Sequence, residues 1–141
     1  MPLRTLTLMC ALALLAGAPN RGRADDEAVA QGRASAKEWL VMLDAQDYDG
    51  TWSAAGELLK AAVTQDEWAR RMSVTLGPLG KVESRAVRSS EYSTTMPGAP
   101  DGEYVVIQFD TSFESKQTAL ENVVMRKQSD GSWRVAGYRI R

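Results

Sequence analysis

The sequence predicts an α+β fold in which three N-terminal helices pack on a curved, four-stranded antiparallel sheet. Apolar residues recur at steps of three and four over the first half of the chain, as on one face of a helix. Over the second half they crowd or alternate in short segments separated by turn residues, as in strands. Because helices and strands occupy separate halves, we expect the helices to cover one face of the sheet.

The first 24 residues are predicted to be a signal peptide, which leaves a single domain over residues 25–141. Arg4 gives a short positive start, and the apolar run over residues 6–18 is shorter than the roughly 20 residues of a bilayer span. Gly22-Arg23-Ala24 fits a cleavage site after Ala24, and a cut after Ala18 is the alternative. We therefore expect a periplasmic or secreted protein without a stable membrane anchor.

The composition argues against several classes of functional site. The sequence has no histidine, and its one cysteine, Cys10, lies inside the predicted signal segment in a poor context for lipid attachment. A mature chain without cysteine or histidine cannot form a Cys–His or Ser–His–Asp site, and it lacks the usual ligands of zinc, copper and haem. The 17 basic and 18 acidic residues give no nucleic-acid footprint. We expect no cofactor, no metal and no nucleic-acid partner.

Three helices are predicted, and each carries one tryptophan on its apolar stripe, which favours a core position. The first helix ends near Gln46, and its apolar face comprises Val29, Gly32, Ala36, Trp39, Leu40 and Leu43. The second spans residues 48–62, with Trp52 inward and Gly56 as a weak point. The third begins at the capping box Thr64-Gln65-Asp66-Glu67, carries Trp68 inward and ends at Gly77-Pro78.

Four strands are predicted over residues 81–95, 103–113, 119–128 and 132–141, joined as a meander. Strict alternation in the second strand assigns one set of side chains to the helices: Val105, Ile107, Phe109, Thr111 and Phe113. The opposite face would hold Tyr104 and Val106, joined by Ala136 and Tyr138 from the last strand. A partly apolar outer face leads to the hypothesis that a second subunit covers it in a homodimer.

Several motifs in a fixed order resemble an exported bacterial family, domain of unknown function 4019 (DUF4019). They are Ala36-Lys37-Glu38-Trp39-Leu40, Leu43-Asp44-Ala45-Gln46-Asp47-Tyr48, Trp52, Trp68, Leu76-Gly77-Pro78-Leu79-Gly80, the run from Pro97 to Tyr104, and Trp133-Arg134-Val135-Ala136-Gly137-Tyr138. The resemblance covers nearly the whole mature chain and implies no catalytic residue. More loosely, the arrangement is similar to NTF2-like, cystatin-like proteins, which implies a cone with a pocket. That group includes both enzymes and binding domains, so the fold does not decide the function.

The interior of such a cone would be rich in aromatic side chains. The candidate pocket-lining residues are Trp39, Trp52, Trp68, Tyr92, Phe109 and Trp133. The favoured interpretation is a non-enzymatic exported domain that binds a small apolar ligand or a protein partner. A purely structural or assembly role through the outer sheet face is a further hypothesis.

The alternative class is a cofactor-free lyase or isomerase that uses a carboxylate and a tyrosine. Asp110 and Glu103 are the candidate bases, with Tyr92 and Tyr138 as donors, although the alternation directs Asp110 away from the helices and into solvent. Two further clusters are interpreted as ordinary turn or surface charge: the acidic group Asp44, Asp47 and Asp49, and the basic group Arg85, Arg88, Arg126 and Lys127.

Overall fold

The computed structural model describes residues 21–141, and it has the predicted α+β architecture. The predicted signal segment, with Cys10, lies outside the described residues except for its last four, which form the first turn of helix α1 (Arg21–Asp44). Within residues 21–141, no helix combines the length and the apolar character needed to cross a membrane.

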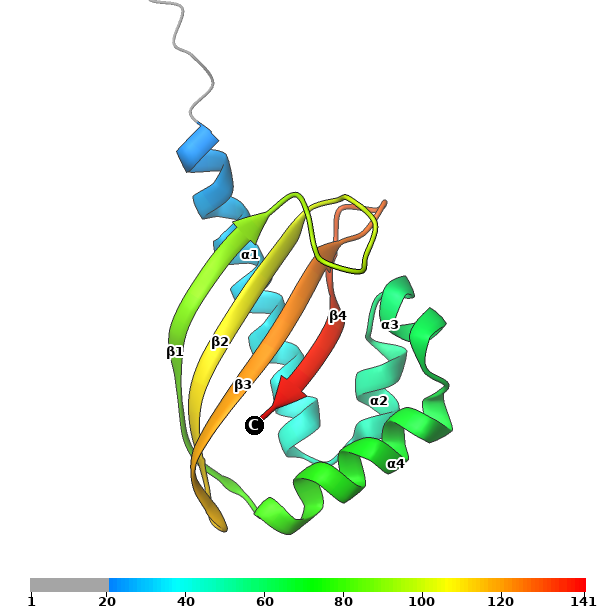
Figure 1. Ribbon diagram of the computed structural model, residues 1–141, viewed down its shortest axis with the longest axis vertical. Helices are drawn as coiled ribbons and strands as arrows, with labels where there is room; N and C mark the ends of the chain where they lie inside the picture. The colour runs from blue at the N-terminus through cyan, green and yellow to red at the C-terminus, as the bar shows by residue number, and fades with distance from the viewer. Residues whose placement is uncertain (1–20) are drawn as a thin grey trace, which may run out of the picture.

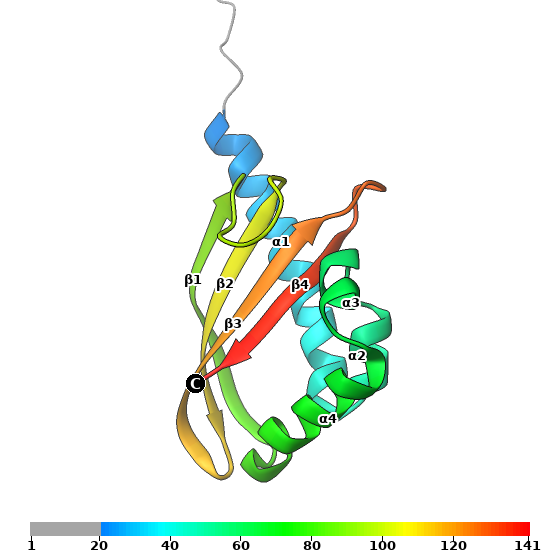
Figure 2. The same cartoon turned by 45° about the vertical axis from the view of Figure 1, so that its right-hand side comes forward.

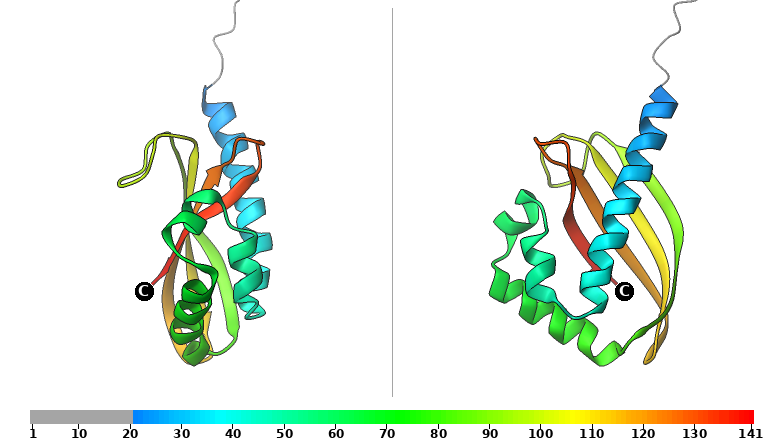
Figure 3. Two further views of the ribbon diagram at one scale, coloured as in Figure 1. Left: turned by 90° about the vertical axis from the view of Figure 1, so that its right-hand side faces the viewer. Right: turned by 180° about the vertical axis from the view of Figure 1, so that it is seen from behind.

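Helix α1 crosses one face of the sheet, and three shorter helices follow it along the side of the last strand (Figure 3). These are α2 (Tyr48–Ser53), α3 (Glu57–Ala62) and α4 (Gln65–Leu76), with a 3-10 turn η1 (Gly77–Leu79) after α4. The capping box is confirmed: the Glu67 N–H donates to the Thr64 hydroxyl, and the Glu67 carboxylate accepts from the Thr64 N–H.

The predicted second helix is in fact two helices, because the chain leaves helical geometry at Gly56. The backbone of Gly56 is extended, with φ −81° and ψ 174°. Its N–H donates to the carbonyl of Val135, at a distance of 2.9 Å, instead of to a carbonyl one turn earlier in the helix. A hydrogen bond to β4 therefore divides the predicted helix at Gly56, the residue whose helix propensity is low.

The sheet is an antiparallel meander in which each strand pairs with the next along the chain (Figure 1). The strands are β1 (Val82–Ser93), β2 (Tyr104–Phe113), β3 (Lys116–Lys127) and β4 (Trp133–Ile140). A two-residue turn at Glu114 and Ser115 joins β2 to β3, so β3 begins three residues earlier than predicted. The remaining strand bounds agree with the predicted ranges to within two residues.

The core lies between the sheet and α1, and β2 presents to it the side chains that the alternation predicted. Val105 and Ile107 are fully buried, and Phe109, Thr111 and Phe113 are buried beside them. From α1 the core receives Ala36, Trp39, Leu40 and Leu43. The closest approach of helix and sheet is at Gly32, where an added Cβ would lie 2.9 Å from the Cβ of Val105.

A bulge in β4 reverses the predicted orientation of Tyr138. Val124 pairs with Gly137 while Met125 pairs with Val135, so Ala136 is an extra residue in the ladder. Because side chains alternate along a strand, one extra residue exchanges the two faces beyond it. Tyr138 therefore faces the helices, where its ring contacts that of Trp39, and the prediction that it lies on the outer face is wrong.

The outer face of the sheet is partly covered by the chain itself. Tyr104 points to that face and is fully buried. The loop between β1 and β2 passes in front of this end of the sheet (Figure 1). The Tyr104 hydroxyl donates to the carbonyl of Pro100 at 2.6 Å, and the guanidinium of Arg126 lies 5.6 Å from the tyrosine ring. Of the four residues predicted for an apolar outer face, Tyr104 is therefore buried by its own chain and Tyr138 lies on the opposite face.

Candidate functional site

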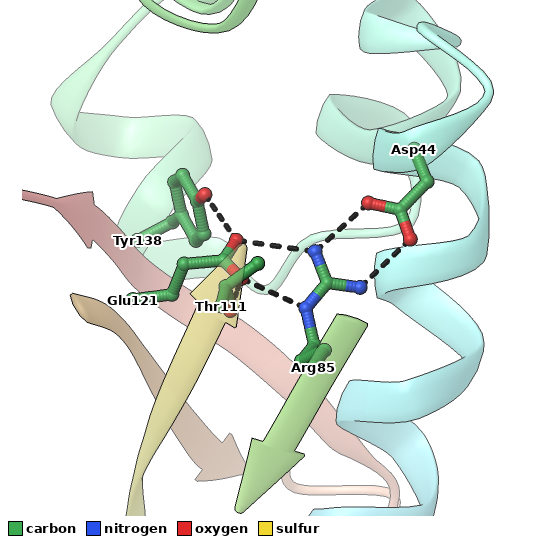
Figure 4. Close-up of polar contacts among 5 residues, drawn as sticks. All are labelled: Asp44, Arg85, Thr111, Glu121 and Tyr138. Carbon is green, nitrogen blue, oxygen red and sulfur yellow. Dashed lines mark hydrogen bonds and ion pairs between the residues drawn. The ribbon is translucent and has the colours of Figure 1, made fainter. Parts of the chain in front are cut away.

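A buried carboxylate, Glu121, lies at the centre of a polar cluster built from all four strands and α1 (Figure 4). It occupies the helix-facing side of β3, opposite Phe109, and lies between the buried apolar residues Ala119 and Val123 of that strand. Its oxygens accept hydrogen bonds from the Thr111 hydroxyl and from the Tyr138 hydroxyl, the latter at 2.5 Å. The side chain has no exposed surface.

Arg85 of β1 neutralises Glu121 and ties it to the end of α1. Its Nε and Nη2 donate to the two oxygens of Glu121 at 2.8 and 3.2 Å. Its Nη1 and Nη2 donate to the two oxygens of Asp44 at 2.7 and 2.9 Å (Figure 4). One guanidinium thus binds two carboxylates through both of its edges, a geometry that Arg provides and Lys does not.

The electrostatics keep Arg85 charged and Tyr138 protonated. Burial alone would lower the pKa of Arg85, but hydrogen bonds to Asp44 and Glu121, and the charges of both, outweigh burial and raise it. Burial raises the pKa of Tyr138 well above its ordinary value, and the neighbouring charge of Glu121 and the hydrogen bond to it raise it further. At neutral pH the tyrosine is therefore a donor to Glu121, and the arginine is a fixed cation.

An aromatic row continues from the cluster into the helices. The rings of Tyr138 and Trp39 are 5.6 Å apart, and those of Trp39 and Trp68 are 6.1 Å apart. The indole N–H groups of both tryptophans donate to Thr51, which is fully buried. Trp39 donates to its carbonyl and Trp68 to its hydroxyl, each at 2.9 Å. Such tilted contacts are the usual arrangement of packed aromatic rings.

The space beside Glu121 is too small for a substrate. The gap bordered by Asp44, Glu121 and Tyr138 measures only about 20 Å³, the size of one water rather than the several hundred Å³ of ligand sites. Larger hollows lie at the surface. A groove of about 610 Å³ lies between α1 and the start of β4, one of about 600 Å³ between the end of β4 and α4, and one of about 490 Å³ between α1 and β1.

The six predicted pocket-lining residues are distributed over several places. Trp39 and Trp133 line the same groove, between α1 and the start of β4, whereas Trp68 lines the groove beside α4 and Phe109 the groove beside β1. The indole of Trp52 donates to the Val63 carbonyl at 2.9 Å and lies under the Lys60 ammonium. The hydroxyl of Tyr92 donates to Glu103 at 3.2 Å, near the other end of the sheet.

The two predicted acid–base candidates lie apart from the Glu121 cluster, and Asp110 borders a surface hollow of about 280 Å³. Asp110 is exposed on the outer face, where it pairs with Arg88 at 3.6 Å, and Glu103 pairs with Lys127 at 3.5 Å and with Tyr92. The basic residues Arg85, Arg88, Arg126 and Lys127 do not form one patch. Arg85 pairs with Glu121, Arg88 with Asp110 and Lys127 with Glu103, and Arg126 lies beside the ring of Tyr104. Asp47 caps α2 by accepting from the Gly50 N–H.

Glu121 was missed by sequence reasoning, although a signal was present. Ala119, Glu121, Val123 and Met125 alternate along β3, so a charged residue occupies one position of an otherwise apolar face. Its partner Arg85 was treated as surface charge, because its inward direction depends on a register that includes two shifts in β1.

The comparisons with known proteins identify a family but no relative of known function. No curated protein and no solved structure matches the chain. The family model described as protein of unknown function (DUF4019) matches residues 35–138, which include every member of the polar cluster. Since this match covers well over half of the chain, the protein belongs to the DUF4019 family.

Proposed function

We propose that the protein is an exported, non-catalytic module that binds a small molecule or a protein through its surface grooves. The observation that carries this proposal is that hydrogen bonds within the protein occupy the carboxylate of Glu121, the one buried carboxylate within residues 21–141 that lies beside a tyrosine. A carboxylate has about four acceptor positions, and Glu121 accepts four hydrogen bonds: two from Arg85, one from Thr111 and one from Tyr138. No acceptor position is free to take a proton from a substrate.

The same arrangement argues against the lyase or isomerase alternative. A general base must come within hydrogen-bond distance of the proton it removes, and the gap beside Glu121 holds about 20 Å³. The pair of Glu121 and Tyr138 does supply the two residue types that such an enzyme would use. Arg85 holds that pair in a closed ion-pair network, which favours a role in fixing α1 against the sheet.

A screen of metabolites and peptides by thermal shift tests the proposal. A ligand present at about 100 times its dissociation constant adds about 2.7 kcal/mol of stability, which is a readily measured shift in the unfolding temperature. Any compound that binds should be recovered unchanged by mass spectrometry. A compound that the wild-type protein converts, and that Tyr138→Phe leaves intact, would overturn the proposal and support the enzyme.

Export is tested by the mass of the protein recovered from the bacterial periplasm or medium. Cleavage after Ala24 leaves a chain that begins at Asp25 and contains no cysteine. Recovered material that still carries Met1, or that is labelled by a thiol reagent under denaturing conditions, would contradict the predicted processing.

A further inference from the structure

We propose that the free edge of β4, together with α4, binds an extended, acidic segment of a partner protein as an additional strand. This inference rests on the proposed binding function and names its partner class. It also assigns a site, defined here as the β4 groove: the surface between residues 136–140 of β4 and residues 59–75 of α3 and α4, with a volume of about 600 Å³.

The backbone at the end of β4 has hydrogen-bonding groups that the sheet does not use. Leu120 and Arg141 exchange two backbone hydrogen bonds, at 2.8 and 3.1 Å. Bonded and non-bonded pairs alternate in an antiparallel ladder, and Tyr138 and Ile140 fall at the non-bonded positions opposite Val123 and Glu121. Their N–H and C=O groups therefore point away from β3, into the β4 groove.

The fold covers the start of this edge but not its end. Val135 accepts the N–H of Gly56 at 2.9 Å, so α3 is attached to the first half of β4 (Figure 2). Within residues 21–141, no backbone group outside the sheet bonds to Tyr138 or Ile140. An exposed strand edge with unpaired groups is a template for another strand.

The walls of the β4 groove supply apolar contacts for alternate side chains of a bound strand. Leu59, Trp68 and Met72 are buried at its base. Val74 lies at its margin with 70% of its surface exposed, one of two large apolar side chains so exposed in the described chain. At about 3.3 Å per residue, the free part of β4 accommodates a segment of four or five residues.

The charge at the groove decides which occupant fits. Arg70, Arg71 and Arg139 line it and are exposed, no acidic residue lines it, and none of the three arginines forms an ion pair within residues 21–141. In a chain with one more acidic than basic residue, this is a local excess of positive charge. An acidic partner segment complements it.

Two other occupants are disfavoured by the same charges. A second copy paired edge to edge would bring the same three arginines of both molecules together, and like charges in an interface are repulsive. The N-terminal residues 1–20 of the chain carry Arg4 and no acidic residue, so they offer no complementary charge.

Fluorescence anisotropy with short labelled peptides tests the proposal on the purified protein. The first peptide alternates glutamate with valine, the second alternates lysine with valine, and the third is the glutamate peptide with alternate backbone nitrogens methylated. We expect the first to bind and the other two not to, because the second has the wrong charge and the third cannot complete a ladder.

Arginine substitutions in the protein complete the test. Because exposed ion pairs contribute modestly, Arg70→Ser and Arg139→Ser should each weaken binding of the glutamate peptide roughly threefold, with Lys37→Ser, an exposed lysine of α1, as the matched control without effect. Failure of the glutamate peptide to bind, or equal binding of the methylated peptide, would overturn this inference. The proposed non-catalytic function would fail on a different result, the conversion of a ligand.

Discussion

Arg85 of β1 and Glu121 of β3 form an ion pair across the strand that separates them, with Nε and Oε1 2.8 Å apart. The pair passes over Thr111 of β2, which also donates to the carboxylate. Through Asp44, the same arginine reaches the last residue of α1. One guanidinium therefore joins strands β1 and β3 to helix α1, and Thr111 of β2 is attached to the same carboxylate.

Replacement of Arg85 by methionine should cost about 3–5 kcal/mol of folding free energy, because it leaves the buried Glu121 without a cation. The double variant Arg85→Met with Glu121→Leu should be more stable than Arg85→Met alone, since it removes the unpaired charge. Urea unfolding of the wild type, both single variants and the double variant measures these differences. Additive losses would show that the two side chains do not interact in the folded protein.

The buried phenol of Tyr138 should make the stability fall in alkaline solution. Its pKa is raised above the ordinary value of 10.0, so above about pH 10 the unfolded chain releases a proton that the folded chain keeps. The stability that this phenol contributes is complete below that pH and is lost as the pH rises towards the folded-state pKa, by up to about 1.4 kcal/mol per pH unit.

Tyr138→Phe should therefore have a flatter stability profile above pH 10 than the wild type. Burial also raises the pKa of Tyr48 and of Tyr92, but both residues are present in both proteins, so the difference isolates Tyr138. Urea unfolding at a series of alkaline pH values measures it. Parallel profiles for the two proteins would mean that Tyr138 titrates normally in the fold.

Thr51→Val should destabilise the helical layer by about 1–3 kcal/mol, because it leaves the buried indole N–H of Trp68 without an acceptor. Thr51→Ser keeps the hydroxyl and removes one methyl group, at a cost of about 0.8 kcal/mol. Thermal unfolding compares the two. If the valine variant were as stable as the serine variant, the bond between Thr51 and Trp68 would not contribute.

Gly32→Ala should destabilise the protein, although alanine in place of glycine normally stabilises a helix interior by about 1 kcal/mol. The new methyl group would lie 2.9 Å from the Cβ of Val105, and overpacking of this kind costs about 1–3 kcal/mol. Gly137→Ala is the control, because a Cβ there would lie 3.9 Å from the Cβ of Val124, an ordinary van der Waals distance.

A second variant tests whether the free-energy cost of Gly32→Ala arises from close packing against Val105. Val105→Ala keeps the Cβ atom but removes the two γ-methyl groups that would lie 3.1 Å from the new methyl group. The two substitutions together should therefore cost less than the sum of their separate costs. Chemical denaturation gives all three values. Strict additivity would mean that the cost of Gly32→Ala does not arise from the two γ-methyl groups of Val105.

Sequence periodicity predicts the features that depend only on local spacing within one helix or strand. The helix faces, the capping box at Thr64 and the inner face of β2 all follow from local spacing, and the structure has them. The break at Gly56 and the reversal at Ala136 depend on bonds to distant residues, so no local pattern contains them. Glu121 differs, because the alternation of Ala119, Val123 and Met125 along β3 already indicates that its side chain faces inward. Its partner Arg85 becomes evident only when the strands are paired in register.

The extra residue at Ala136 has a consequence for comparing members of this family. A relative that lacks one residue between Trp133 and Tyr138 would need no bulge, and its tyrosine would still face inward, opposite the equivalent of Val123. A relative of the same length keeps the tyrosine inward only if it also keeps the bulge, because in a regular ladder the tyrosine would face outward and Arg139 inward. The pairing of β4 with β3, and not the number of residues alone, therefore determines which relatives share the buried network.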